Sequence, residues 1–192
     1  MGLSRRLVFL LRISESHGII RRYFVVNGFD GALTMLGIIM GFALAEPTNT
    51  DVVISACLGA AIALAVSGVS SAYISEVAER RKRLHELEQA MIRDLTHSAH
   101  GEAARWMPLL VGLVNGMSPL LISLLIMLPL WLAKAGLALP VSPLLLAVLI
   151  ALAIVFLLGV FLGRISGISW LRSGLQTIVI AVATISLVYL FS

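Results

Sequence analysis

The 192-residue chain is 59% hydrophobic and only 12% charged, whereas a soluble domain averages roughly 45–50% apolar and about 25% charged residues. This composition excludes an ordinary soluble globular protein and indicates one membrane domain. In such a chain the formal net charge of +4 reports membrane topology rather than nucleic-acid binding. The single cysteine, Cys57, excludes an intrachain disulfide and a cysteine-rich metal site.

Residues 1–22 form the first predicted element, a basic segment with five arginines and a short apolar stretch. The stretch is too short for the core of a signal peptide. We predict a basic amphipathic segment lying on the membrane surface; a disordered tail is the alternative.

Five apolar runs follow, each long enough to cross the hydrocarbon, which takes roughly 20 residues. Pro108 is expected in the first turn of the third run, and Ser142 and Pro143 are expected to cap and begin the fourth. The predicted fold class is an all-α integral membrane protein, with one domain over residues 23–192. Its five transmembrane helices are predicted at about residues 23–44, 52–75, 107–132, 143–163 and 175–191.

Residues 76–100 are predicted to extend the second transmembrane helix into the cytosol, because residues 76–98 contain no proline or glycine. Gly101 is expected to end this helix. One face is apolar and must pack on another helix or on a second copy of the chain. That face carries Val77, Leu84, Leu87, Met91 and Leu95.

The distribution of cations predicts the orientation. Arginine and lysine fall in the N-terminal segment, between the second and third spans, and between the fourth and fifth. The opposite side holds Glu46, Asp51 and one cation, Lys134. By the positive-inside rule the protein is multi-pass, with its N-terminus cytosolic and its C-terminus on the opposite side.

Asp30 is the only acidic residue inside a predicted span. A charge at the bilayer centre costs at least about 2.5–3.5 kcal/mol, so an aspartate in a membrane helix indicates an ion or proton site. Two structural roles are alternatives: Asp30 caps a helix break at residues 28–31, or it pairs with Asn115 or an N-terminal arginine.

Residues near Asp30 could complete a cation site. Thr34, Gly37 and Gly41 share its helix face, and Met35 lies beside that face. Oxygen ligands with a thioether suit Fe²⁺ or Mn²⁺, although plain packing is the alternative for Met35. Further polar groups that could face Asp30 are Ser67, Ser70, Asn115 and, across a dimer, a second Asp30.

A second acidic group lies on the predicted cytosolic helix, with carboxylate and imidazole side chains on roughly one face. These side chains could give a metal access to the membrane path. The alternative is a solvated helix with ion pairs between residues four apart. The candidates are Glu76, Glu79, Glu86, Asp94 and His97.

Enzyme motifs are missing: there is no G-x-S-x-G, H-E-x-x-H, P-loop or dinucleotide-binding pattern. We therefore expect no catalytic activity and no permanently bound cofactor.

The sequence resembles the vacuolar iron transporter family. The run Asn27-Gly28-Phe29-Asp30-Gly31-Ala32-Leu33-Thr34 is similar to the start of that family's first helix, where an aspartate is essential. Ser70 to Ser75 is similar to the end of its second helix, and Leu171 to Leu175 and Val188 to Leu190 are similar to its last helix. The chain departs from the family at Gly68, where a methionine is expected, and at Ala72, where a glutamate is expected. It also lacks most of the family's cytosolic metal-binding domain.

The resemblance implies a five-helix protomer that forms a homodimer and exports Fe²⁺ or Mn²⁺ from the cytosol in exchange for protons. Asp30 matches the family's intramembrane carboxylate. The expected partners are the lipid bilayer, the metal cation, the proton and a second copy of the chain. The alternative function is a membrane interaction protein without transport, whose cytosolic helix binds a partner.

Overall fold

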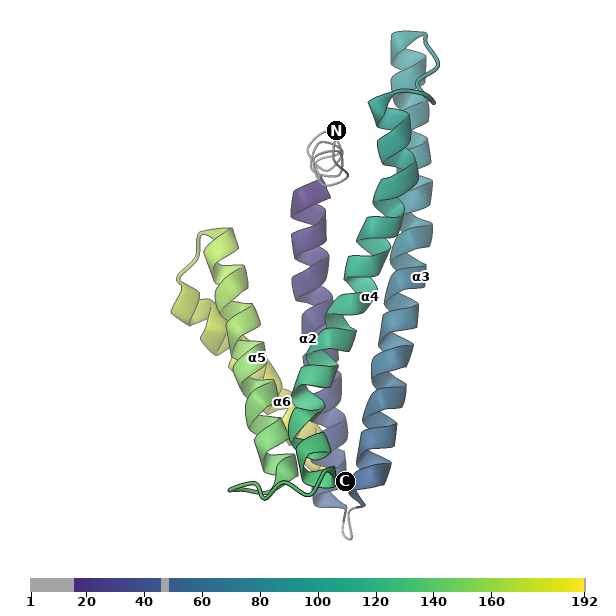
Figure 1. The fold of residues 1–192 in the computed structure, drawn as a ribbon. Helices are drawn as coiled ribbons and strands as arrows, with labels where there is room; N and C mark the ends of the chain where they lie inside the picture. The colour runs from purple at the N-terminus through teal and green to yellow at the C-terminus, as the bar shows by residue number, and fades with distance from the viewer. Residues whose placement is uncertain (1–15, 46–48, 192) are drawn as a thin grey trace. The chain divides into compact units, whose positions relative to one another are not determined.

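The computed structural model describes residues 16–45 and 49–191, and every regular element in this part of the chain is a helix (Figure 1). All five helices are long and apolar enough to cross a membrane, which confirms the all-helical prediction and fits a multi-pass integral membrane protein. The helices are α2 (Ser16–Leu44), α3 (Thr50–Met91), α4 (Ala99–Lys134), α5 (Pro143–Ser166) and α6 (Trp170–Phe191).

Four helices begin earlier than predicted: α3 by two residues, α6 by five, and α2 and α4 by more. α2 starts at Ser16, so the part of the predicted surface segment that the structure describes belongs to a helix; residues 1–15 of that segment lie outside the described residues. α4 starts at Ala99, and Pro108 therefore lies inside it rather than in its first turn. The prediction for Pro108 was wrong because the polar residues 99–106 continue the helix and cap it with Ser98, whose Oγ accepts from the backbone N–H of His100 at 3.2 Å.

The extension of the second predicted span is helical but shorter than expected. α3 is one unbroken helix of 42 residues, about 63 Å long, which is roughly twice the thickness of the hydrocarbon. It ends at Met91 rather than near residue 100, because Ile92 adopts a left-handed conformation with φ of 49°. Gly101 therefore lies in the first turn of α4, and the expectation that it ends the preceding helix was wrong.

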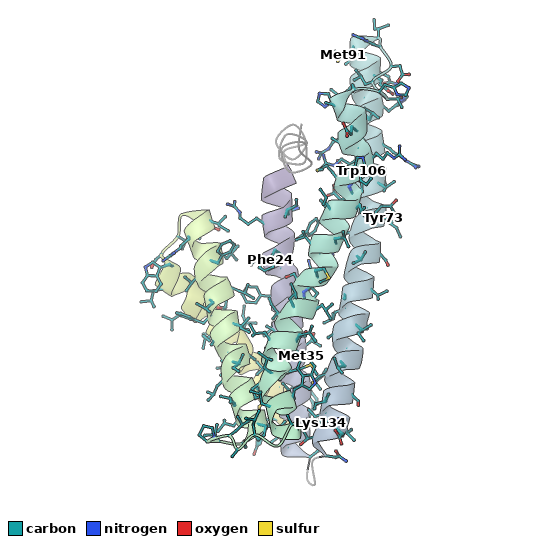
Figure 2. All side chains as sticks on the ribbon, in the orientation of Figure 1. Phe24, Met35, Tyr73, Met91, Trp106 and Lys134 are labelled. Carbon is teal, nitrogen blue, oxygen red and sulfur yellow. The ribbon has the colours of Figure 1, made fainter. Side chains whose placement is uncertain are left out.

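The chain divides into two compact units, which are described separately. Of the described residues, the hairpin unit contains 16–24 and 65–117, and the core unit contains 25–45, 49–64 and 118–191. In the hairpin unit the second half of α3 returns through a turn into the first half of α4. Figure 2 places Met91 beside this turn, with Trp106 and then Tyr73 farther along the hairpin.

Glycines bring the two helices of the hairpin unit into backbone contact. A Cβ added at Gly116 would lie 2.9 Å from the backbone nitrogen of Val69 and closer still to the carbonyl of Ala65. One at Gly112 would lie 3.0 Å from the carbonyl of Val69. The Asn115 side chain donates to the carbonyl oxygen of Gly68 at 2.7 Å. Close approach and an interhelical hydrogen bond are the two devices that hold membrane helices together.

The core unit is built around a continuous apolar cluster with members from all five helices. α5 begins as predicted, with the Ser142 hydroxyl accepting from Leu145 N–H at 3.2 Å and Pro143 in the first turn. α5 and α6 lie side by side (Figure 1), and the Thr177 hydroxyl hydrogen-bonds the carbonyl of Val155 at 3.0 Å. The fully buried cluster members include Met35, Leu36, Ile39, Val53, Cys57, Ile126, Met127, Leu130, Ala147, Ala151, Val155 and Ala181.

Candidate ion-binding site

Asp30 lies in an unbroken stretch of α2, because the helix runs without interruption from Ser16 to Leu44. The alternative in which Asp30 caps a break at residues 28–31 was therefore wrong. Its side chain is exposed, and no residue that the structure describes forms a hydrogen bond or an ion pair with its carboxylate. Asn115 belongs to the other compact unit, so the predicted pairing of Asp30 with Asn115 stays a prediction.

Two glycines on either side of Asp30 fix the direction of its side chain. A Cβ at Gly28 would lie 2.7 Å from the Ile122 side chain, and one at Gly31 would lie 2.8 Å from the backbone of Pro119. These glycines let α2 rest directly on α4. Asp30 is about 200° from Gly28 and about 100° from Gly31 around the helix, so the close packing of the glycines turns the carboxylate away from α4.

The predicted face of α2 that carries Asp30 is open. Thr34 is half-buried on this face, and a Cβ added at Gly37 or Gly41 would meet no described atom within 4 Å. We call Asp30, Thr34, Gly37 and Gly41 the open face of α2. A Cβ added at Gly59 on α3 would likewise meet no described atom within 4 Å. Gly37 and Gly41, although spaced four apart like the glycines of close helix pairs, therefore do not mediate packing inside the core unit.

The other predicted membrane ligands lie elsewhere. Met35 is fully buried in the apolar cluster (Figure 2), about 140° around the helix from Asp30, which favours the packing alternative. Ser67 belongs to the hairpin unit and is exposed on α3. Asn115 belongs to the same unit, is buried, and uses its side-chain amide on the Gly68 carbonyl. Within the core unit, Asp30 thus shares its helix face with Thr34 and not with Met35.

The carboxylates along α3 form ion pairs with residues four apart. Glu76 accepts from Arg80 at 3.2 Å and both side chains are buried, while Glu79 accepts from Arg83 at 3.0 Å on the exposed surface. The Glu86 Oε1 atom lies 4.0 Å from the Nζ atom of Lys82. These three carboxylates therefore form the i,i+4 pairs of the alternative prediction, but only the pairs of Glu79 and Glu86 are solvated, because Glu76 and Arg80 are buried.

Asp94 and His97 lie in the turn after α3 rather than on the helix. Asp94 accepts from the backbone N–H of Thr96 at 2.8 Å and from its hydroxyl. These hydrogen bonds, helped by the charge of His97, hold the pKa of Asp94 below its ordinary value of 3.8. Across the described residues, no three histidine, cysteine, aspartate or glutamate side chains converge to hold a metal ion.

The sequence reasoning missed the two glycines that orient Asp30 and an ion pair of the core unit. Gly28 and Gly31 flank the aspartate at a spacing of three, which was a visible signal for close helix contact. Lys134, at the end of α4, forms a 2.6 Å ion pair with Asp51, in the first turn of α3 (Figure 2). Each charge lies at the helix end where the helix dipole favours it.

Comparison with known proteins gives one informative relative. No protein-family model matches the chain, and no solved structure matches it, so the resemblance to the vacuolar iron transporters stays a prediction. The chain is similar to "Uncharacterized protein MJ0645" of Methanocaldococcus jannaschii, with 30% identity over 172 residues that cover 88% of this chain and 86% of the relative. The chain belongs to the family of this archaeal protein.

Proposed function

We propose that the protein is a membrane transporter that exports a divalent metal cation, Fe²⁺ or Mn²⁺, from the cytosol in exchange for protons. The proposal depends on one observation: the carboxylate of Asp30 has no hydrogen-bond or ion-pair partner among the described residues, although it lies in the apolar helix segment Ile20–Leu44. Transport is preferred to catalysis because the site offers a single charged group and no nucleophile–base pair.

An isolated carboxylate in a membrane helix is unstable unless something neutralises it. A bound cation favours its ionised form, and departure of the cation favours protonation. One carboxylate that alternates between these states can therefore couple the flux of a cation to an opposite flux of protons. Asp30 is the candidate for both roles, and the Thr34 hydroxyl, four residues along the helix, is an additional oxygen on the same face.

A second copy of the chain would complete this site. The open face of α2 carries Gly37 and Gly41 with no described atom near their missing side chains, and glycines in membrane helices usually allow another helix to approach closely. A homodimer packed on this face would bring a second Asp30 toward the first. Two carboxylates and two hydroxyls provide the oxygen ligands that Mn²⁺ accepts readily.

The orientation proposed from the charges places the hairpin between α3 and α4 in the cytosol, with the N-terminus on the same side and the C-terminus opposite. The hairpin region holds Arg80, Arg83, Arg93 and Arg105. Its carboxylates Glu76, Glu79, Glu86 and Asp94 and the imidazole of His97 would act on an approaching cation only through long-range electrostatics.

Uptake of Fe²⁺ and of Mn²⁺ into proteoliposomes with a pH gradient tests the proposal. Wild-type protein should give uptake that depends on the gradient, and Asp30→Asn and Asp30→Ala should abolish it while folding normally. Asp51→Asn is the matched control, because it removes another exposed carboxylate of the same unit, one that is paired with Lys134. No uptake of either ion by folded wild-type protein would refute transport of these metals.

A second candidate function is a membrane interaction protein without transport. It is favoured by the apolar end of the hairpin, where Met91 is 59% exposed and the neighbouring Ile92 is 94% exposed. In this function the exposed apolar side chains at the end of α3 would contact the partner. Unchanged metal sensitivity of cells that lack the protein, together with no uptake in liposomes, would favour this function over transport.

A further inference from the structure

The helix α4 changes its close-packing partner between residues 116 and 118. Its residues Gly112 and Gly116 lie against the backbone of α3 near Val69, within the hairpin unit. Its residues Pro119 and Ile122 lie against Gly31 and Gly28 of α2, within the core unit. The boundary between the two compact units crosses α4 at the same place, between residues 117 and 118.

The backbone of α4 lacks one helical hydrogen bond at this change of partner. Pro119 has no N–H group, so it cannot donate the helical hydrogen bond to the carbonyl of Asn115. Gly116 adds a residue with greater backbone freedom one turn earlier. In membrane helices proline positions of this kind are common sites of kinking.

We infer that residues 116–119 form a hinge in α4. The half of α4 before the hinge is bound to α3 by glycine contacts and by the hydrogen bond from Asn115 to Gly68. The half after it is bound to α2 by the contacts of Gly28 and Gly31. A bend of α4 at the hinge leaves both sets of contacts intact. The long helix α3, which also continues from one unit into the other, has to bend with it. The inference concerns the mechanics of the helix and holds whether or not the protein transports a metal.

The other two prolines of α4 do not fit this role. Pro108 has contacts of the hairpin unit on both sides, with Met107 in its small apolar cluster and Gly112 against α3. Pro129 lies between Met127 and Leu130, both in the apolar cluster of the core unit. Each proline therefore has the same packing partners before and after it, and Pro108→Ala is a matched control for Pro119→Ala.

Distances between spin labels in lipid nanodiscs test the hinge. Labels are attached at Arg105 and Leu128 in a Cys57→Ala background, because both positions are exposed. In a straight helix these positions are about 34 Å apart. Wild-type protein should give a broad or two-component distance distribution, Pro119→Ala should narrow it, and Pro108→Ala should leave it broad.

A second label pair keeps the test decisive if Pro119→Ala does not fold. Arg105 and Met117, which is also exposed, lie on the same side of the hinge, about 18 Å apart in a straight helix. This pair should give one narrow distribution in the wild-type protein. A narrow distribution for the pair that spans Pro119, or equal breadth for both pairs, would overturn the hinge.

Discussion

Replacing Gly116 by alanine should destabilise the protein, although alanine is the better helix former. The added methyl group would lie 2.9 Å from the backbone nitrogen of Val69 and closer still to the carbonyl of Ala65. Both atoms belong to the backbone of α3, which cannot move aside as a flexible side chain can. The two helices must therefore separate by about 1 Å to restore van der Waals distances.

The magnitude follows from three effects. Overpacking of a core position typically costs about 1–3 kcal/mol. The separation also stretches the 2.7 Å hydrogen bond from Asn115 to Gly68, and interhelical hydrogen bonds in membrane proteins contribute about 0.6 kcal/mol on average and about 1.7 at most. The higher helix propensity of alanine returns about 1 kcal/mol. The expected loss is about 2 kcal/mol, or about 4–8 °C in Tm for a domain of this size.

The native cysteine offers an assay for this prediction. Cys57 is fully buried in the core unit, so a thiol-reactive fluorophore reports when the protein opens on heating. Far-UV circular dichroism should be followed in parallel to record any separate loss of helix in the hairpin unit. The control is Gly59→Ala, because a Cβ at this helical position meets no described atom within 4 Å; its Tm should be unchanged or higher.

Equal Tm values for wild type and Gly116→Ala would show that α3 and α4 do not have the close contact from which the magnitude was calculated. A similar loss in Gly59→Ala would mean that alanine destabilises these helices for a reason other than the contact.

Three further predictions concern residues outside the proposed path. Ile92→Gly should stabilise the protein by about 0.5–1 kcal/mol, measured by chemical denaturation. Ile92 is 94% exposed with φ of 49°, and glycine relieves about 1–2 kcal/mol of left-handed strain, which outweighs the conformational entropy that glycine adds to the unfolded chain. The control Ile92→Ala should give no such gain. Thr96→Ala should raise the pKa of Asp94 toward 3.8, measured by NMR titration, because the hydrogen bond from the Thr96 hydroxyl is the largest cause of the lowered pKa. In the wild-type protein the hydrogen bonds to ionised Asp94 stabilise the fold above pH 3.8, and this stabilisation is lost as the pH falls through the lowered pKa of the folded state. Lys134→Met should change stability by less than about 1 kcal/mol, because its ion pair with Asp51 is exposed, and a double-mutant cycle measures this energy.

The apolar runs predicted the five helices, because hydrophobic length is a strong and local signal. The boundaries were less predictable where polar residues continue a helix beyond the apolar run. Ser16 and Ala99 begin their helices well before the first apolar window. The end of α3 at Met91 depends on a left-handed isoleucine, which no residue preference would indicate.

The candidate site was predictable in part. Asp30 was identified by its charge alone, and the structure leaves its carboxylate without a partner among the described residues. Its neighbours were harder to predict, because helix spacing shows which residues share a face but does not show which face is buried. Met35 packs in the core and Asn115 binds a backbone carbonyl, and both outcomes depend on how the helices pack in three dimensions.

The glycines divide into two classes that should evolve differently. Where a Cβ would meet backbone or packed side chains within one protomer, larger residues should be rare among relatives of this chain. Gly37, Gly41 and Gly59 have no such constraint and should drift freely to alanine or serine. If they stay glycine in distant relatives, selection must come from a surface outside the protomer that lies against α2 and α3. The constrained positions are Gly28, Gly31, Gly68, Gly101, Gly112, Gly116, Gly159, Gly163 and Gly174.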